Sequence, residues 1–361
     1  MTIRKKTRPV AVRSLVIGGE APVSIQSMTN LPIEDVRGTV AQIERLRAAG
    51  ADLVRLALRN EDSIAHLREI RTAVDMPLSA DVHFNHRIAI KAIEAGIDKV
   101  RINPGNIGDD DRVRDVVAVA RERRVPIRIG VNGGSIDLKT YHAVSPESLA
   151  QSALDHVRIL EDNDFRDIVV SIKSSDIRQT IDANVRFSEL RDYPLHIGLT
   201  EAGYGASCIV QSTLAIGHLL LMGLGDTVRV SMTGDPVGEI PVARTILEAA
   251  GLRVPTVRII ACPTCGRTDP SLDILALAER VESETARFHD ALYAAGRTVT
   301  VAVMGCEVNG PGEAAHADVG LAGGRGGRMI LFAKGEKIAV VDVGDAVARL
   351  VDEIEAMIAP A

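Results

Sequence analysis

The sequence predicts an α/β protein, a (β/α)8 TIM barrel followed by a small α+β domain. Three observations lead to this prediction: short apolar runs alternate with amphipathic stretches, eight such runs follow one another, and the pattern changes near residue 253. Repeated β/α units build a parallel sheet, and eight of them close a barrel. At 361 residues the chain is also longer than one hydrophobic core usually supports, so a second domain is expected.

The eight candidate strands are short, β-branched runs, each followed by a helical pattern. They are Val23–Ser27, Leu53–Leu58, Leu78–Phe84, Lys99–Asn103, Ile127–Asn132, Ile168–Lys173, Leu195–Glu201 and Thr227–Met232. A doubly wound open sheet is the alternative, but no G-x-G-x-x-G fingerprint follows the first strand. Ahead of the barrel, Val10–Ile17 and Pro22–Gln26 are interpreted as a hairpin that turns at Gly18-Gly19 and caps one end of the barrel.

The pattern changes after Gly251, which divides the chain into a barrel domain over residues 1–253 and an α+β domain over residues 254–361. The second domain is expected to contain a strand, a long helix and a second strand, followed by a glycine-rich turn, a hairpin and a terminal helix. The first three elements are placed at Val257–Ala261, Ser271–Ala295 and Val299–Met304. A proline in a short polar break marks the boundary between the two domains.

Composition limits the function classes. The net charge is −6 and aromatic residues make up only 2% with no Trp, which argues against a nucleic-acid surface built on basic patches or base stacking. No apolar run approaches the ~20 residues that span a bilayer. The basic N-terminal residues are not followed by an apolar segment of signal-peptide type, so we expect a cytoplasmic location and no membrane partner.

Basic side chains recur inside the predicted strands. Because a charge buried in a barrel interior costs several kcal/mol, we expect these side chains at the carboxyl-terminal rim, facing a ligand. Five cations on an acidic protein indicate a phosphorylated or diphosphorylated ligand, since arginine binds phosphate oxygens bidentately. For any one arginine, pairing with a neighbouring carboxylate that braces the barrel remains the alternative. The five are Arg55, Arg101, Arg128, Lys173 and Arg229.

Further polar residues accompany the cations at the strand ends. Glu201, next to Thr200, is the best-placed carboxylate for proton transfer, and His83 is a second candidate. The alternative for Asp81 and His83 is that they only bond the backbone at the rim. The remaining candidates are Asn103 and Asn132, which begin tight turns with free N–H groups (Asn103–Asn106 and Asn132–Ser135), and Ser231. Cys208 lies in a helical pattern, where a core role is expected.

Three cysteines lie in the second domain. Cys262 and Cys265 share one tight turn, and Cys306 follows a strand. A C-x-x-C pair serves zinc sites, iron–sulfur clusters and dithiol redox motifs alike. A structural zinc would need a fourth ligand, for which His316 is the only nearby histidine, and a dithiol motif would leave Cys306 unexplained. An iron–sulfur cluster is therefore favoured, with Glu313 seven residues beyond Cys306 as a carboxylate for the iron that lacks a cysteine.

The sequence resembles the 4-hydroxy-3-methylbut-2-enyl diphosphate synthase family of the non-mevalonate isoprenoid pathway. The matching motifs run the length of the chain, and the two cysteine motifs are highly specific together. The motifs are Gln26–Asn30, Ala80–Phe84, Arg101–Asn106, Arg128–Ser135, Ser171–Asp176, Leu199–Gly203, Cys262–Arg267 and Gly305–Glu313. The resemblance implies the compact bacterial form, a barrel with an iron–sulfur domain and no inserted third domain.

The resemblance also implies a reaction. Substrate would be 2-C-methyl-D-erythritol 2,4-cyclodiphosphate, opened and dehydroxylated with two electrons from flavodoxin or ferredoxin. One 4Fe-4S cluster would be held by Cys262, Cys265, Cys306 and Glu313, with Glu313 giving way to substrate. The five cations would bind the diphosphate with help from Asn132 and Ser231, and Glu201 would be the acid/base group. The family forms homodimers that share the active site between subunits. The rival from another class is a phosphate-binding barrel with a structural zinc in its second domain.

Overall fold

In the computed structural model, residues 4–83, 85–103 and 110–358 are described, and the chain divides into two compact units, residues 1–253 and 254–361.

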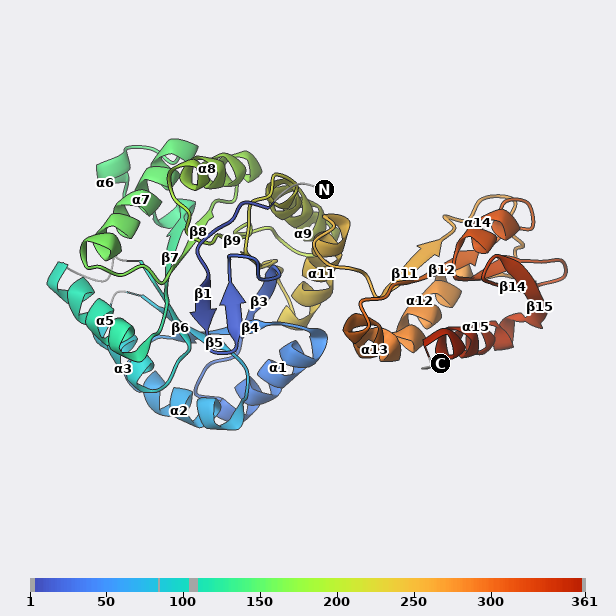
Figure 1. Ribbon diagram of the computed structural model, residues 1–361, viewed down its shortest axis with the longest axis horizontal. Coiled ribbons are helices and arrows are strands. Elements are labelled where there is room, and N and C mark those ends of the chain that lie inside the picture. Colours follow the sequence, from blue (N-terminus) through green and yellow to red (C-terminus); the bar gives the residue numbers. More distant parts are fainter. Residues whose placement is uncertain (1–3, 84, 104–109, 359–361) are drawn as a thin grey trace. The chain divides into compact units, whose positions relative to one another are not determined.

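The first unit is a barrel of eight parallel strands surrounded by helices (Figure 1). The strands are β3 (Ser24–Met28), β4 (Leu53–Leu58), β5 (Leu78–Val82), β6 (Lys99–Ile102), β7 (Ile127–Asn132), β8 (Ile168–Lys173), β9 (His196–Ile197) and β10 (Thr227–Val228). They pair in the order β8-β7-β6-β5-β4-β3-β10-β9. A parallel bridge between Val170 and Leu195 joins the two end strands, so the sheet closes on itself. The predicted barrel is confirmed.

All helices of the barrel except the short α6 bury residues against the strands or neighbouring helices. The described helices are α1 (Val36–Ala49), α2 (Ser63–Ala73), α3 (His86–Glu94), α5 (Asp110–Arg123), the short α6 (Leu138–Tyr141), α7 (Pro146–Asp162), α8 (Ile177–Leu190), α9 (Gly205–Ser212), α10 (His218–Leu221) and α11 (Glu239–Ala249). Local sequence fixes their ends. The Asp35 side chain accepts from the Gly38 N–H at the start of α1, and Gly50 ends that helix in the left-handed region at φ 101°.

The N-terminal hairpin differs from its prediction. Its strands are β1 (Val10–Val12) and β2 (Leu15–Ile17), and the turn between them lies at Arg13-Ser14. Gly18-Gly19 instead bends the chain into β3, the first barrel strand, where a Cβ on Gly18 would lie 2.5 Å from the Arg8 carbonyl oxygen. The glycine pair is therefore needed for a close approach of backbone rather than for a hairpin turn. Val10, Val12 and Ile17 pack against Leu53 and Val169, so the hairpin covers the amino-terminal end of the barrel as expected.

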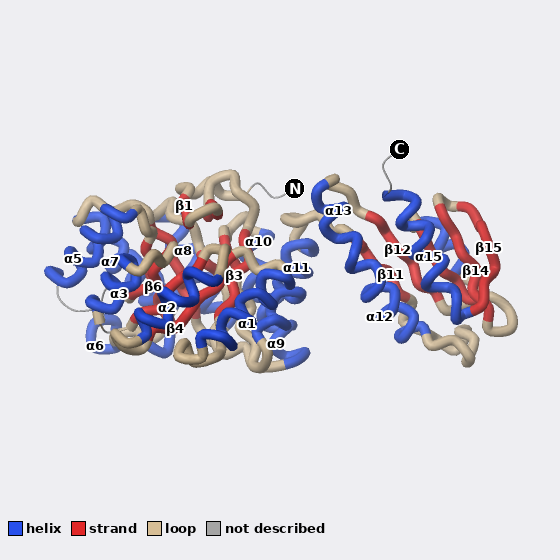
Figure 2. Tube along the Cα trace, turned by 90° about the horizontal axis from the view of Figure 1, so that it is seen from below, coloured by secondary structure: helices blue, strands red, loops and turns tan. Residues whose placement is uncertain are grey.

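The second unit is a five-stranded sheet with helices on both faces (Figure 2). Its strands are β11 (Val257–Ala261), β12 (Val299–Met304), β13 (Val319–Gly323), β14 (Arg328–Ala333) and β15 (Glu336–Asp342). The pairs β11–β12 and β12–β13 are parallel, and the pairs β13–β14 and β14–β15 are antiparallel. Its helices are α12 (Ile274–Thr285), α13 (His289–Ala294), α14 (Gly310–His316) and α15 (Val343–Ile358). α12 and α15 share one apolar core with the sheet, and α14 packs into a smaller, separate one.

Two predicted elements of this unit need correction. The single long helix expected near Ser271–Ala295 is two helices, because a 3-10 turn at Ala286–Phe288 separates α12 from α13. The Gly-Pro-Gly segment expected as a turn before Glu313 is the first turn of α14, where proline is favourable because its missing N–H would have no intrahelical partner.

Candidate active site

The strand register places polar side chains in two rows inside the barrel. Partners across parallel strands point to the same face of the sheet, so each row faces the interior. The row nearer the amino-terminal end runs Met28–Arg55–Ser79–Lys99 across four neighbouring strands, and the second runs Asp81–Arg101–Arg128 across three. The interior of this barrel is therefore largely polar.

Asp81 connects the cations of the second row. Arg101 Nη1 donates to Asp81 Oδ1 at 3.1 Å, Arg55 Nε lies 3.8 Å from Oδ2, and His83 Nε2 lies 3.4 Å from Oδ1. Burial alone would raise the pKa of Asp81, but Arg55, His83 and Arg101 together hold it well below its usual value. Asp81 is thus an ionised anchor that fixes two arginines and a histidine at the end of β5.

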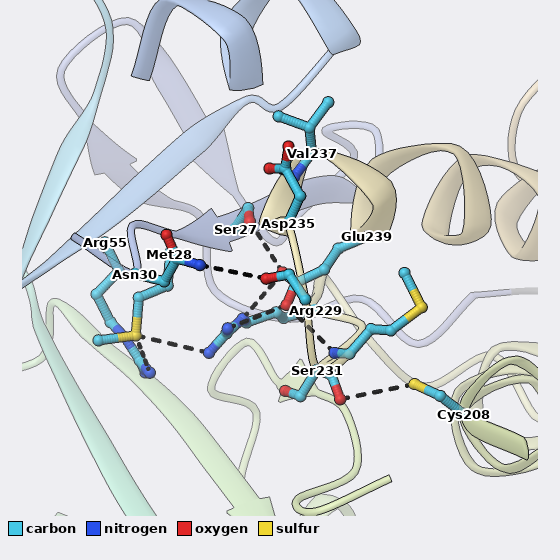
Figure 3. Close-up of polar contacts among 12 residues, drawn as sticks. Ser27, Met28, Asn30, Arg55, Cys208, Arg229, Ser231, Asp235, Val237 and Glu239 are labelled. Carbon is cyan, nitrogen blue, oxygen red and sulfur yellow. Dashed lines mark hydrogen bonds and ion pairs between the residues drawn. The ribbon is translucent and has the colours of Figure 1, made fainter. Parts of the chain in front are cut away.

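A second carboxylate, Glu239 at the start of α11, holds Arg229 (Figure 3). Arg229 Nη2 donates to Glu239 Oε1 at 3.2 Å, and its Nε donates to Oε2 at 3.3 Å. The hydroxyl of Ser27 also donates to Glu239, at 2.8 Å. The Met28 sulfur accepts weak hydrogen bonds from Arg55 and Arg229 on opposite sides, which brings the two guanidinium groups together.

Arg128 and Lys173 are both almost completely enclosed, although Lys173, the last residue of β8, lies at the carboxyl-terminal end of its strand. Arg128 is 3% exposed and Lys173 6% exposed. Burial lowers the pKa of both side chains well below the usual range, and Arg128 and its cationic neighbours lower that of Lys173 further. Arg55 is less affected, with burial lowering its pKa to about 10. Burying these charges costs free energy, and the carboxylates of Asp81 and Glu239 offset only part of that cost.

Other predicted rim residues lie at the carboxyl-terminal strand ends. Asn103 and Asn132 follow β6 and end β7, while Thr200 follows β9. Residues 104–106 of the predicted Asn103–Asn106 turn, and Phe84, lie outside the described residues. The carbonyl oxygen of Ser231 accepts a weak contact from the buried Cys208 thiol at 3.6 Å, so Cys208 supports the strand end from α9.

Glu201 differs from these residues because it is exposed and its backbone lies in the left-handed region at φ 56°. Such a conformation is uncommon for a residue with a side chain and is often found at functional sites. Among the described residues, Glu201 makes no hydrogen bond or ion pair with the barrel cations. Its place after β9 and its backbone conformation are what single it out.

The three predicted cysteine ligands lie at one end of the second sheet. Cys262 follows β11 directly and its N–H donates to Val303 of β12, while Cys306 lies two residues after β12. The side chain of Arg267 lowers the pKa of Cys265 and donates to its sulfur at 3.4 Å. The backbone N–H groups of residues 308–310 lower the pKa of Cys306. Both effects favour thiolate, the form that binds metal.

Three thiols at one end of the sheet, two of them favoured as thiolates by Arg267 and by backbone N–H groups, are a donor set that suits an iron–sulfur cluster. No group of three or more His, Cys, Asp or Glu side chains in the described parts of the chain is arranged to hold one ion. The ligands of a cluster bind different iron atoms and therefore stand further apart than those of one ion. Glu313 lies in the first turn of α14, close in sequence to Cys306, but it is exposed and no contact joins it to the thiols. Beside the thiols, a cavity of about 390 Å³ is lined by Arg267, Thr268, Gly305, Glu307 and Arg325.

Sequence reasoning missed several residues of the barrel interior. Lys99 and Gln26 point inward and bond one another at 3.0 Å, and Glu239 holds Arg229. His196 is fully buried on β9. The alternation Lys99, Arg101, Asn103 is a signal that could have revealed Lys99, since residues two apart in a strand share a face. For Glu239, at a helix start, no comparable signal exists.

Within the described part of the chain, no helix is both long enough and apolar enough to cross a membrane.

Comparison with known proteins gives matches along nearly the whole chain. The family model described as the GcpE TIM-barrel domain matches residues 7–244, and that of the GcpE protein C-terminal domain matches residues 258–356. A protein of Caldanaerobacter subterraneus subsp. tengcongensis, named 4-hydroxy-3-methylbut-2-en-1-yl diphosphate synthase (flavodoxin), is 47% identical over 360 residues, covering 99% of this chain and 98% of the relative. A protein of Clostridium perfringens with the same name is 46% identical over 355 residues, covering 98% and 99%.

Among solved structures, dihydropteroate synthase from Stenotrophomonas maltophilia aligns with a TM-score of 0.51 at 15% identity, covering 69% of this chain and all of that protein. This likeness concerns the fold alone. The two family models together span most of both units, and the relatives match from end to end. The chain therefore belongs to the GcpE family.

Proposed function

We propose that this chain is a 4-hydroxy-3-methylbut-2-en-1-yl diphosphate synthase, which opens 2-C-methyl-D-erythritol 2,4-cyclodiphosphate and removes its C3 hydroxyl as water. The observation that carries this proposal is the 46–47% identity, over nearly the full chain, to relatives with that name. Flavodoxin, which their name includes, is the proposed donor of two electrons, and ferredoxin is the alternative. The rival, a phosphate-binding barrel with a structural zinc, is not favoured by these relatives.

The charge inside the barrel supports a diphosphate substrate. Two electrons and one proton convert the cyclic dianion into the open diphosphate trianion and water, so negative charge on the diphosphate grows during the reaction. Arg55, Arg101, Arg128, Lys173 and Arg229 outnumber the carboxylates that pair with them, Asp81 and Glu239. A surplus of fixed positive charge stabilises the more negative product side of the reaction more than the substrate, which is how binding energy contributes to rate.

Residues at the strand ends have the proposed proton and positioning roles. Glu201, exposed after β9, supplies the proton with which the C3 hydroxyl leaves as water. Asp81 keeps His83 and Arg101 in place, and His83 is the second proton-transfer candidate. Asn103, Asn132, Thr200 and Ser231 provide hydrogen bonds to substrate oxygens.

The cofactor proposed for the second unit is one 4Fe-4S cluster with Cys262, Cys265, Cys306 and Glu313 as its ligands. When bound, such a cluster stores and passes on single electrons and acts as a Lewis acid. Arg267 offers positive charge close to the thiolates and offsets part of the negative charge that cluster and ligands carry. The wall of the cavity beside Cys306 includes the backbone of Gly305, Gly323, Gly324 and Gly326.

Turnover is the test of this proposal. The chain, purified without oxygen and reconstituted with iron and sulfide, should convert the cyclic diphosphate into 4-hydroxy-3-methylbut-2-enyl diphosphate when reduced flavodoxin is supplied, as detected by mass spectrometry. Cluster-free protein is the control. A colourless protein that contains zinc and binds the cyclic diphosphate without converting it would instead establish the rival.

A homodimer with a shared active site is part of the proposal and has its own test. A variant that lacks the proposed proton donor of the barrel, Glu201→Gln, and a variant that lacks a thiol, Cys306→Ser, should each have very low turnover alone. Mixing them produces heterodimers in which one active site has both intact halves, if each site draws on two subunits. Recovered turnover in the mixture supports the shared site, and a mixture as inactive as its components contradicts it.

A further inference from the structure

Lys99, the first residue of β6, is completely enclosed by the barrel. Its Nζ donates to Oε1 of Gln26 on β3 at 3.0 Å. Lys99 lies two residues before Arg101 on the same strand, which puts it about 7 Å deeper in the barrel on the same face. A buried lysine normally has an anionic partner, but an amide oxygen carries no net charge. The functional roles described above do not involve this side chain.

The charged and titratable groups that face Lys99 are basic. They are Arg55 from β4, Arg128 from β7 and His196 from β9. Burial lowers the pKa of Lys99 well below its usual value, and Arg128 and Arg55 lower it further. The register partner of Lys99 is Ser79 on β5, a residue without charge. In the ligand-free barrel, enclosure and the two arginines therefore disfavour the ammonium form of Lys99.

Polar atoms around Lys99 also lack hydrogen-bond partners. They are Nε and Nη1 of Arg128, Oγ of Ser79 and both ring nitrogens of His196. Buried polar atoms are nearly always hydrogen-bonded, and the two Arg128 nitrogens can only donate, so these two donors lack acceptors. The carboxylates Asp81 and Glu239 are already engaged by Arg101 and Arg229. An incoming anion is the group that would supply both the acceptors and the negative charge.

We propose that Lys99 is a further anion-recognition residue of this barrel, one that takes up a proton from solvent when a diphosphate enters. The neutral amine becomes an ammonium group, and no other bond changes. The inference rests on the proposed function, because the anion is the substrate of that function. Proton uptake adds positive charge beneath Arg128 only when the anion binds. The ligand-free barrel therefore does not bury this additional charge.

The test uses the full-length, cluster-reconstituted protein and inorganic pyrophosphate as the probe. Calorimetric titrations in two buffers of different ionisation enthalpy, at one pH, give both the affinity and the number of protons taken up. Lys99→Met, which preserves most of the side-chain volume, should weaken pyrophosphate binding roughly 10-fold or more and reduce proton uptake relative to the wild type. Lys91→Met, which removes an exposed lysine of α3, is the matched control and should change neither quantity.

A second readout separates this role from a structural one. Because the ligand-free protein no longer encloses an amine, Lys99→Met should raise its Tm, whereas loss of a structural contact would lower it. Lys99→Gln carries the same readouts if the Met variant does not fold. Equal affinity and equal proton uptake in wild type and variant overturn the inference. Failure of the wild type to bind pyrophosphate at all would instead count against the proposed diphosphate site.

Discussion

The cations of the barrel and the thiols of the second unit are held in place by different means. Arg55, Arg101 and Arg229 are fixed by Asp81, Glu239 and the Met28 sulfur, all within the folded barrel. The thiols of Cys262, Cys265 and Cys306 contact backbone N–H groups and Arg267. We therefore expect that the barrel is organised for its ligand in advance, whereas the arrangement of the cysteine segments depends on the proposed cluster.

Cys306→Ser gives the largest expected effect and separates the two regions most sharply. Loss of one thiolate removes a ligand that the other residues do not replace, so the variant should lose iron and turnover. Pyrophosphate binding by the barrel should stay close to that of the wild type, as measured by calorimetry. Cys208→Ser, at the buried cysteine of α9, is the control and should keep its iron. A barrel that no longer binds pyrophosphate after Cys306→Ser would show that the two regions are not independent.

Glu201→Gln tests the proposed proton donor at the barrel rim. The amide cannot donate a proton as a carboxylic acid does, so kcat should fall by roughly 100- to 10,000-fold. Iron content and the paramagnetic signal of the reduced protein should be unchanged, because Glu201 is not among the proposed ligands. Turnover close to the wild-type rate would remove Glu201 from the mechanism.

The variant Arg128→Met tests whether this buried arginine of the barrel binds the diphosphate. Hydrogen bonds to charged groups contribute about 1.5–3 kcal/mol, so KM for the cyclic diphosphate should rise roughly 10- to 100-fold. Arg158→Met, at an arginine on the exposed face of α7, is the matched control and should leave KM unchanged. If both variants behave alike in steady-state kinetics, the buried cations do not bind the diphosphate.

The smallest expected effect comes from His156 on α7, and it concerns stability rather than activity. Burial lowers the pKa of His156 to about 4, from a usual value of 6.5. Between those two values the unfolded chain binds a proton that the folded barrel does not, so the stability of the barrel falls as the pH drops from about 6.5 to 4. The loss is at most about 3 kcal/mol. His156→Gln should reduce this acid sensitivity in thermal unfolding.

The exposed His218, changed to Gln, is the control for that measurement. Identical loss of Tm between pH 6.5 and 4.5 in wild type, His156→Gln and His218→Gln would contradict the assignment.

Fold and site were not equally predictable from the sequence. The bounds of β4, β7 and β8, and of β11 and β12, agree with the predicted strands, because a short run rich in Val, Ile and Leu marks a strand even where a polar residue interrupts it. Strands β9 and β10 are shorter than predicted, because backbone pairing with the neighbouring strands stops before the polar residues at the rim. The hairpin turn was misplaced because glycine is a stronger turn signal than Arg13-Ser14.

The predicted site residues have a similar limit. The cost of burying a charge led to the prediction that Arg101 and Arg128 lie at the carboxyl-terminal rim, and the two are register partners on β6 and β7. Periodicity does not give depth, so Lys99 at a strand start looks like a solvent-exposed flank although it is fully enclosed. Pairing across the barrel interior, as between Lys99 and Gln26, depends on how the whole sheet curves, which no local pattern encodes.

The contrast between an organised barrel and metal-dependent cysteine segments is tested most directly by hydrogen exchange of the full chain with and without iron and sulfide. The account predicts that reconstitution slows exchange around residues 262–267 and 305–313, while the strands β3–β8 exchange at the same rate in both forms. Equal protection of the cysteine segments in both forms, or a barrel that becomes protected only on reconstitution, would contradict it.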